Sequence, residues 1–186
     1  MDFGASMWKT VGIDSMDEFY FNGSAYGKLD DKNRFVLPHS FRYGLVEVGK
    51  LEFTISLGLG GCLAIYRKSD MQKIISRFKK NIHQAKYQKF FTFFFSTLHH
   101  TTCDKIGRLS LPSRLKEIVG IKKEIIIAGV LDKIELWPKE VYDKSVENLL
   151  AGKDKELDLA QMTQEAFALL HEEPLLTSND DRNPTT

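Results

Sequence analysis

Hydrophobic positions in this chain fall into short alternating runs and a few stretches with helical spacing. The clearest alternation spans residues 53–57, where Phe53, Ile55 and Leu57 are separated by polar residues. A period of two predicts a strand with one buried face. Residues 70–89 instead repeat hydrophobic side chains every three or four positions, which predicts one amphipathic helix. Short strands interrupted by helices predict an α+β fold.

One segment of the chain occurs twice. Residues 29–38 read LDDKNRFVLP and residues 103–112 read CDKIGRLSLP, so both contain the frame Asp-x-x-x-Arg-x-x-Leu-Pro. The strand pattern at 62–66 also recurs at 133–137. The separation between copies falls from 74 residues at the frame to 71 at this strand. Such a difference is typical of loop variation between duplicated units.

Each copy predicts the same order of elements: strand, turn, strand, short helix and β-hairpin. In the first copy the entering strand is 19–29, the turn is 31–33 and the returning strand is 34–37. The helix is opened by Pro38, carries Phe41, Leu45 and Val48 on one side and ends at Gly49, and the hairpin joins 53–57 to 62–66. In the second copy the entering strand is 98–103, the turn is 104–107 and the returning strand is 108–111. The helix is opened by Pro112 and ended by Gly120, and the hairpin joins 124–128 to 134–137. One such unit has too little hydrophobic surface to fold alone. We therefore expect the copies to fold together.

The repeated frame has the chemistry of a rigid turn. An aspartate carboxylate can accept hydrogen bonds from backbone N–H groups a few residues further along, as in an Asx-turn. The residue before the arginine needs a permissive backbone, which Gly107 supplies in the second copy and Asn33 in the first. The predicted turn-forming residues are Asp30, Asn33, Asp104 and Gly107.

Each turn ends on an arginine, Arg34 or Arg108, at the start of a strand. A guanidinium held in this way loses less rotamer freedom on binding, which is worth about 1–2 kcal/mol. Its fork fits guanine O6 and N7 or a phosphate. Lys32 and Lys105 in the same turns are candidates for phosphate contacts. The alternative is that each arginine only forms an internal salt bridge with the aspartate of its own turn.

The duplicated frame, in a chain of this length, resembles the MraZ family of bacterial transcription regulators, which are relatives of the AbrB-type swapped-hairpin DNA-binding proteins. The resemblance spans about residues 21–143. The family generally has glycine where this chain has Asn33, and asparagine tolerates positive φ better than other side chains. The resemblance implies duplicated AbrB-like β-hairpin units that form a small pseudo-twofold β-barrel flanked by helices.

The same resemblance implies a function. Arg34 and Arg108 would enter double-stranded DNA, and a ring-like homo-oligomer would carry these arginines on one rim. The expected targets are direct repeats in the promoter of the gene cluster for cell division and cell-wall synthesis, which includes the protein's own gene. Linked weak contacts to repeated sites multiply in affinity. Arg42 and Lys116, on the helices behind the turns, are expected to be structural instead.

Five segments are expected along the chain. They are an N-terminal extension at 1–20, a first AbrB-like unit at 21–69, a connecting helix at 70–97, a second unit at 98–143, and a C-terminal helix with an acidic tail at 144–186. The pattern at 158–173 predicts an amphipathic helix within this tail, and the tail is a candidate site for a protein partner.

The net charge of +1 is unevenly distributed. Residues 151–186 hold three bases and eight acids, so residues 1–150 hold 23 bases and 17 acids. The body is moderately basic, and in an oligomer the attraction of such charges for phosphate adds up across subunits.

The sequence shows little sign of metal binding or catalysis. His99 and His100 fall on opposite faces of a strand, so the grouping with Cys103 makes a poor metal site. The sequence lacks nucleophile and nucleotide-binding motifs, a signal peptide and a membrane-spanning hydrophobic run. Cys62 and Cys103 lie far apart. We expect a non-enzymatic protein without cofactor or metal, in the cytoplasm and associated with the nucleoid.

The run at 90–95 contains five phenylalanines and predicts a core and subunit interface. A base-stacking platform is the less favoured alternative. The bases at 70–89 are expected to form a solubilising face. A second functional hypothesis is an oligomeric scaffold that binds another protein through this helical region or the acidic tail, with DNA contact secondary.

Overall fold

The computed structural model describes residues 20–43, 50–80, 82–153 and 158–168. The chain divides into two units, 1–142 and 143–186. The predictions for most of the N-terminal extension, for Leu45, Val48 and Gly49 in the first helix, and for the tail beyond 168 lie outside the described residues.

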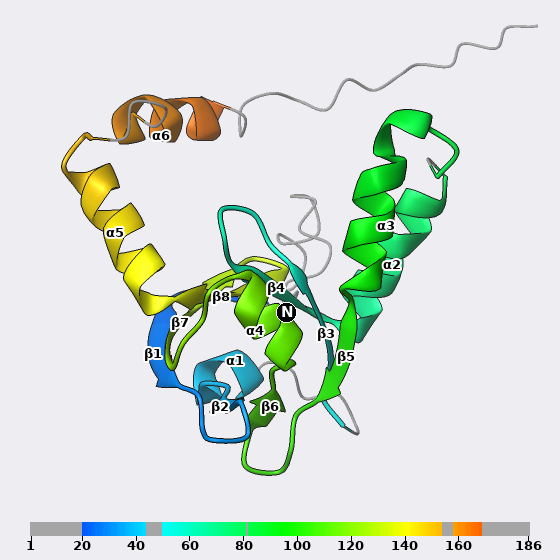
Figure 1. Ribbon diagram of the computed structural model, residues 1–186. Coiled ribbons are helices and arrows are strands. Elements are labelled where there is room, and N and C mark those ends of the chain that lie inside the picture. The colour runs from blue at the N-terminus through cyan, green and yellow to red at the C-terminus, as the bar shows by residue number, and fades with distance from the viewer. Residues whose placement is uncertain (1–19, 44–49, 81, 154–157, 169–186) are drawn as a thin grey trace, which may run out of the picture. The chain divides into compact units, whose positions relative to one another are not determined.

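Two equivalent sets of elements build the first unit (Figure 1). The first set consists of β1 (Ser24–Lys28), β2 (Arg34–Val36), α1 (His39–Tyr43), β3 (Glu52–Leu57) and β4 (Leu63–Arg67). The second set consists of β5 (His99–Thr102), β6 (Arg108–Ser110), α4 (Ser113–Ile118), β7 (Glu124–Val130) and β8 (Lys133–Pro138). The predicted α+β class and the order of elements in each copy are confirmed. Pro112 lies at the N-cap of α4 and does not open it, because its carbonyl accepts the N–H of Lys116.

The strands pair across the two copies. A six-stranded antiparallel sheet has the order β1-β7-β8-β4-β3-β5, and β2 pairs with β6 in a separate two-stranded ribbon. Exchanging the copies maps this order onto itself, which is pseudo-twofold symmetry. The first strand of each copy pairs with the third strand of the other, so neither copy completes a sheet alone. The expected closed barrel is not formed, since hydrogen bonding among the described strands ends at β1 and β5.

The pseudo-twofold axis passes through two pairs of equivalent residues. Phe35 pairs with its own counterpart Leu109 in the ribbon. Ala64 pairs with its counterpart Glu135 between β4 and β8. These pairs reproduce the separations of 74 and 71 residues in the sequence, so the duplication accounts for the register as well as the topology.

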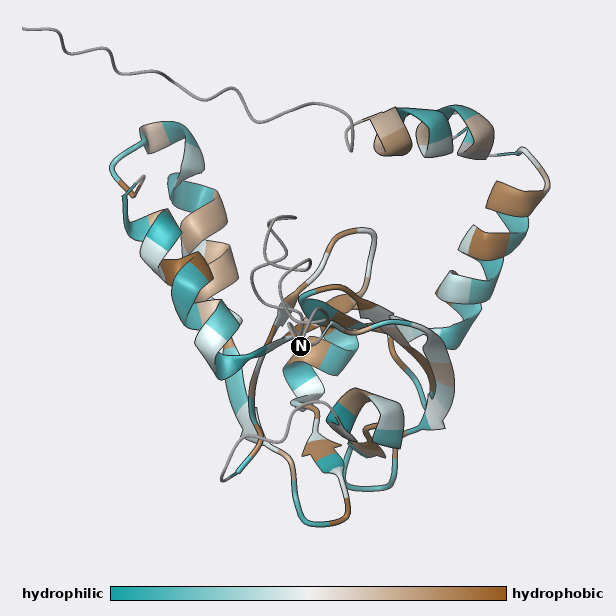
Figure 2. Ribbon diagram, turned by 180° about the vertical axis from the view of Figure 1, so that it is seen from behind, coloured by the Kyte–Doolittle hydropathy of each residue, from teal (hydrophilic) through white to brown (hydrophobic). Residues whose placement is uncertain are grey.

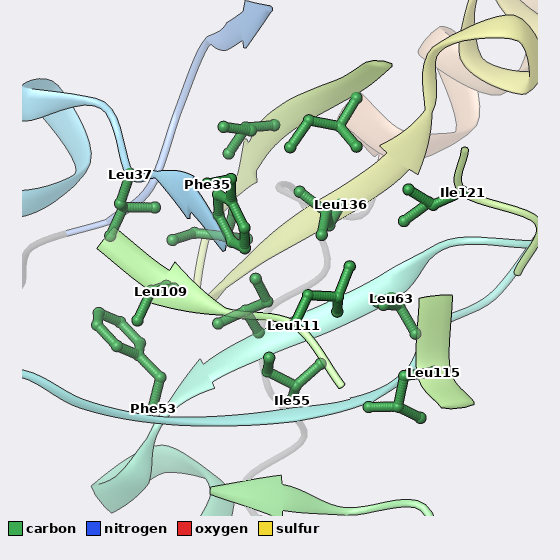
Figure 3. Close-up of a cluster of buried hydrophobic side chains, with 14 of the residues drawn as sticks. Phe35, Leu37, Phe53, Ile55, Leu63, Leu109, Leu111, Leu115, Ile121 and Leu136 are labelled. Atoms are coloured by element: carbon green, nitrogen blue, oxygen red, sulfur yellow. The ribbon is translucent and has the colours of Figure 1, made fainter. Parts of the chain in front are cut away.

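The ribbon and the sheet enclose one hydrophobic core (Figure 3). Phe35, Leu37, Leu109 and Leu111 lie among buried side chains of the sheet such as Ile55. Each buried Phe or Leu side chain contributes about 1.5–3 kcal/mol relative to an exposed one. Residues two apart on a strand share a face, so the frame delivers two core side chains per copy.

β3 is buried on both faces, although the alternation predicted only one buried face. Thr54 and Ser56 are fully buried. The reason is that β3 lies between β4 and β5, while α2 (Lys68–Lys79) packs against β3 and β4. Both hydroxyls have partners, because Thr54 Oγ1 lies 2.8 Å from His100 Nδ1 and Ser56 donates to the Ala64 carbonyl over 3.5 Å.

A helical hairpin replaces the single helix predicted at 70–89. α2 ends at Lys79, the 3-10 helix η2 spans Ala85–Tyr87, and α3 spans Gln88–Ser96. The phenylalanine run lies on α3, where four of its rings contact Phe78 of α2. Phe91 is buried, but Phe90 and Phe93 are half exposed, and the main core cluster of the described residues does not include the run. The hairpin projects from the sheet in Figure 1.

In the described part of the chain, two helices follow β8. They are α5 (Lys139–Leu150) and α6 (Leu159–Ala168), and α6 confirms the larger part of the helix predicted at 158–173. α6 begins there because Oδ1 of Asp158 accepts the N–H groups of Ala160 and Gln161, as an N-cap does. Both helices carry exposed hydrophobic residues, visible as brown segments in Figure 2.

Candidate nucleic-acid interface

The first Asp-x-x-x-Arg turn is held by one carboxylate. Oδ1 of Asp30 accepts the backbone N–H groups of Lys32 over 2.9 Å and of Arg34 over 2.8 Å. The Asn33 N–H donates to the Asp30 carbonyl, and the Asp30 N–H donates to the Arg34 carbonyl. These four bonds are all local to the turn, as in an Asx-turn.

The second turn contains the same four bonds. Oδ1 of Asp104 accepts the N–H groups of Ile106 over 3.0 Å and of Arg108 over 2.8 Å. The Gly107 N–H donates to the Asp104 carbonyl, and the Asp104 N–H donates to the Arg108 carbonyl. The residue before each arginine has positive φ, 54° at Asn33 and 95° at Gly107, where asparagine and glycine are the residues of least strain.

Each arginine is paired with the aspartate of its own turn. Nε and Nη2 of Arg34 lie 2.8 and 2.7 Å from Oδ2 of Asp30. Nε of Arg108 lies 2.7 Å from Oδ2 of Asp104. The internal salt bridge considered as the alternative role is thus present in both turns. The two arginine side chains are nevertheless 29% and 33% exposed, so solvent still reaches them.

The ion pairs keep both aspartates charged. The pKa of Asp30 falls from 3.8 to about 2, mainly because the Arg34 side chain and then the Arg34 N–H donate to the carboxylate. The pKa of Asp104 also falls to about 2, mainly because of the Arg108 N–H and then the Arg108 side chain. At neutral pH each aspartate therefore cancels the charge of its arginine, and attraction for an anion must come from other bases.

Both turns lie at the same end of the first unit, where the loops before β2 and β6 project in Figures 1 and 2. Lys32 and Lys105 are exposed in these loops. They are not equivalent, since Ile106 is the counterpart of Lys32 and Asp31 is the counterpart of Lys105. The internal symmetry therefore covers the aspartates and arginines but not the lysines.

Comparison with known proteins identifies the family. The family model described as "MraZ protein" matches residues 20–93 and matches again at residues 94–167. The chain belongs to the MraZ family. The two adjacent matches show that it carries two MraZ repeats, in agreement with the duplicated frame and the pseudo-twofold sheet.

Relatives of this MraZ chain are named transcriptional regulator MraZ. The protein of Clostridium acetobutylicum is 36% identical over 147 residues, which are 75% of this chain and 99% of the relative. The protein of Clostridium beijerinckii is 35% identical, and that of Desulforamulus reducens is 32% identical, each over 125 residues that cover 67% of this chain and 85% of the relative. The family is one of regulators and not of enzymes.

The two MraZ repeats meet at the turns themselves. Lys116 of α4 donates from Nζ to Oδ1 of Asn33 over 3.0 Å, and Nδ2 of Asn33 donates to Oγ of Ser113 over 3.1 Å. The N–H of Leu111 donates to the Asn33 carbonyl over 2.8 Å. Residues of the second repeat therefore hold the first turn. The sequence did not reveal this contact, because the partners lie about 80 residues apart.

The reciprocal contact uses different side chains. The N–H of Leu37 donates to the Gly107 carbonyl over 2.8 Å. Arg42, the counterpart of Lys116, donates from Nε to the Leu37 carbonyl over 2.9 Å. Its guanidinium lies against Gly107, where an added Cβ would stand 2.5 Å from Arg42 Cζ. Arg42 and Lys116 both have structural contacts, as the sequence indicated.

The histidines of β5 lie apart from the turns. His99 pairs with Ile55 and His100 with Thr54, so the two rings point to opposite faces of the sheet, as the alternation predicted. Burial lowers the pKa of His99. Among the described residues, no three His, Cys, Asp or Glu side chains gather in a metal-binding arrangement. No helix in the same ranges is both long and hydrophobic enough to cross a bilayer.

Proposed function

We propose that this chain regulates transcription by binding double-stranded DNA through its two Asp-x-x-x-Arg turns. One observation carries the proposal. In the β2–β6 ribbon, Arg34 pairs with Ser110 and Val36 pairs with Arg108, while the pair between them is buried in the core. Side chains alternate along strands, so both arginines lie on the outer face of the ribbon. As diagonal neighbours their Cα atoms are roughly 7–8 Å apart.

A two-stranded ribbon fits the major groove of B-DNA. There, each guanidinium can donate two parallel hydrogen bonds to guanine O6 and N7, or grip a phosphate. The paired aspartate supports this role, because a guanidinium already held in place loses less freedom on binding. Since the ion pairs cancel charge, Arg34 and Arg108 act through hydrogen-bond geometry, and Lys32 and Lys105 supply attraction for phosphate.

The target is inferred to be a set of direct repeats in the promoter of the chain's own gene, within the cluster for cell division and cell-wall synthesis. The name of the relatives, transcriptional regulator MraZ, supports a role in transcription. Two arginines read few base pairs, so repeated sites occupied by linked subunits supply the missing affinity. This places the protein in the cytoplasm, at the nucleoid.

A ring-like homo-oligomer would supply the linked subunits. The α2–α3 hairpin supports self-association, since Tyr87, Phe90 and Phe93 are 41–53% exposed, and exposed aromatic surface of this kind marks contact sites. Residues 68–97 carry seven bases and one acid, whereas residues 151–186 carry three bases and eight acids. Opposite charges on different segments of neighbouring copies favour head-to-tail contact, which closes into a ring when the rotation permits.

An electrophoretic mobility shift on the DNA upstream of the chain's own gene, with and without its repeats, tests the function. We expect Arg34→Ala and Arg108→Ala each to abolish repeat binding at physiological salt and to leave the oligomer intact by light scattering. Arg114→Ala removes an exposed arginine of α4, outside the turns and outside the α2–α3 hairpin, and is the control. Unchanged shifts for both turn variants would contradict the proposal.

The second candidate is an oligomeric scaffold in which the hairpin or the acidic tail binds another protein. The exposed aromatic residues of α3 favour it equally. Salt dependence separates the two functions, because repeated phosphate contacts make affinity fall steeply between low and physiological salt. A flat salt dependence would favour the scaffold.

A further inference from the structure

We propose that Lys116 and Arg42 are positioning residues, each of which braces the Asp-x-x-x-Arg turn of the opposite repeat, so that the two arginines are presented as one rigid pair. This inference rests on the proposed DNA-binding role of the turns. In this proposal, neither Lys116 nor Arg42 contacts DNA. Each acts on the residue that directly precedes an arginine, Asn33 or Gly107.

The first brace holds a side-chain amide at both ends. Oδ1 of Asn33 accepts from Lys116 Nζ over 3.0 Å, and Nδ2 of Asn33 donates to Ser113 Oγ over 3.1 Å. Asn33 has φ of 54°, a conformation that asparagine tolerates without being confined to it. Any rotation of its backbone swings Arg34, the next residue. The brace therefore restricts the backbone rotation at Asn33 that would change the direction of the Arg34 side chain.

The second brace works by packing. Arg42 is anchored by its bond to the Leu37 carbonyl, and the Leu37 N–H holds the Gly107 carbonyl. A Cβ on Gly107 would lie 2.5 Å from Cζ, 2.6 Å from Nη1 and 2.7 Å from Nε of Arg42. The guanidinium thus fills the space that a side chain at Gly107 would need, and it limits the movement of the backbone just before Arg108.

The two braces use matched pairs of residues. Asn33 has a side chain, and its partner Lys116 binds the end of it with a slender ammonium. Gly107 has none, and its partner Arg42 packs a broader guanidinium on the backbone. Exchanging one member of a pair breaks the brace, whereas exchanging both members of the first pair builds the glycine–arginine brace of the second. Where the first turn has asparagine and the second has glycine, the partner is lysine in the first case and arginine in the second.

Rigid presentation matters because hydrogen bonds to base edges tolerate little error. A shift of about 1 Å takes a bond of normal length beyond hydrogen-bonding range. Since each repeat braces the turn of the other, the two arginines keep a fixed spacing on the ribbon.

The test is an exchange series in the full-length chain, read on the repeat DNA upstream of its gene. We expect Gly107→Asn to weaken binding about tenfold or more, because the new side chain displaces Arg42. Gly107 has φ of 95°, which strains any side chain, so the rescue is measured on the other turn. Asn33→Gly should also weaken binding, and Asn33→Gly with Lys116→Arg builds a glycine–arginine brace that should restore affinity to within about threefold. A double variant no better than Asn33→Gly would overturn the proposal.

Lys116→Met separates positioning from direct contact, since it keeps the hydrophobic stem and removes the donor. A positioning residue lowers affinity without changing the salt slope, whereas a lost phosphate contact reduces that slope by about one. A reduced slope would therefore overturn the assignment.

A second measurement needs no DNA. Hydrogen exchange of the Lys32 and Ile106 amides, which bond to the turn aspartates, should quicken roughly tenfold in the broken variants and slow again in the rebuilt ones. Exchange rates that stay the same in the broken and rebuilt variants would overturn the proposed positioning role. Failure of the wild-type chain to bind DNA would instead contradict the proposed function, and the exchange measurement would still test the positioning role.

Discussion

Lys116 Nζ in the second repeat lies 3.0 Å from Oδ1 of Asn33 in the first, across 83 residues of sequence. This bond joins a helix of one repeat to the turn of the other, and Arg42 approaches Gly107 in the reciprocal way. The strands show the same exchange, since β1 pairs with β7 and β5 with β3. The duplication has therefore produced one structural module whose halves complete each other, and not two modules in tandem.

Removing a turn aspartate should weaken DNA binding even though it makes the chain more positive. Asp30→Ala releases Arg34 and leaves the N–H groups of Lys32 and Arg34 without their acceptor. Ordering the freed arginine then costs more, so we expect affinity to fall about tenfold by fluorescence anisotropy. Asp30→Asn keeps an acceptor oxygen and should lose less.

Asp31→Ala is the matched control, because it removes the same charge from an exposed position of the same turn. It should bind as well as the wild type or better. If Asp30→Ala bound as tightly as Asp31→Ala, charge alone would decide affinity and the preorganised turn would have no role.

Acid should loosen both turns within a defined pH window. The pKa values of Asp30 and Asp104 are about 2 in the folded chain, below the ordinary 3.8. A depressed folded pKa means that the carboxylates stabilise the fold fully above about pH 4 and that this contribution is lost as pH falls toward 2. The measurement compares urea unfolding of the wild type with that of Asp30→Asn/Asp104→Asn.

The stability difference between these two proteins should stay constant from roughly pH 5 to 8 and shrink only below about pH 4. A difference that changed near neutral pH would show that another titrating group governs the turns.

Truncating the residues on the pseudo-twofold axis should strongly destabilise the fold. Phe35 and Leu109 are fully buried and face each other in the ribbon. Phe35→Ala should cost about 3–5 kcal/mol and Leu109→Ala about 2–5 kcal/mol in denaturant unfolding. The double variant should cost less than the sum, because the two cavities merge. Val36→Ala, at a half-exposed neighbour, should stay within about 0.5 kcal/mol of the wild type.

Cys62 should resist thiol reagents until the chain unfolds. It is buried, and burial raises the pKa of its thiol to about 12. At pH 7 the thiol is then almost wholly protonated, and thiolate is the reactive form. In a Cys103→Ser variant, where Cys62 is the one remaining thiol of the sequence, labelling by DTNB should follow the unfolding rate. Rapid labelling of the folded variant would contradict this expectation.

Predictions from the sequence were most accurate for local features. The strands, the turns and the short helices depend on residues a few positions apart, and the repeated frame located them in both copies. The single helix predicted at 70–89 was wrong because hydrophobic spacing continued across a break that carries no proline or glycine between α2 and η2. β3 was expected to have one exposed face, but neighbouring strands and α2 cover it.

The sequence by itself determined the duplication, the chemistry of each Asp-x-x-x-Arg turn and the alternation that sends Phe35 and Leu37 inward. All of these follow from bonds and periodicities within a few residues. Only the tertiary structure decided that the repeats exchange strands, that Arg34 and Arg108 share one face of a ribbon, and that Lys116 and Arg42 brace the opposite turns. These relationships join residues 44 or more positions apart, and the packing of one shared core selects them, which local patterns do not encode.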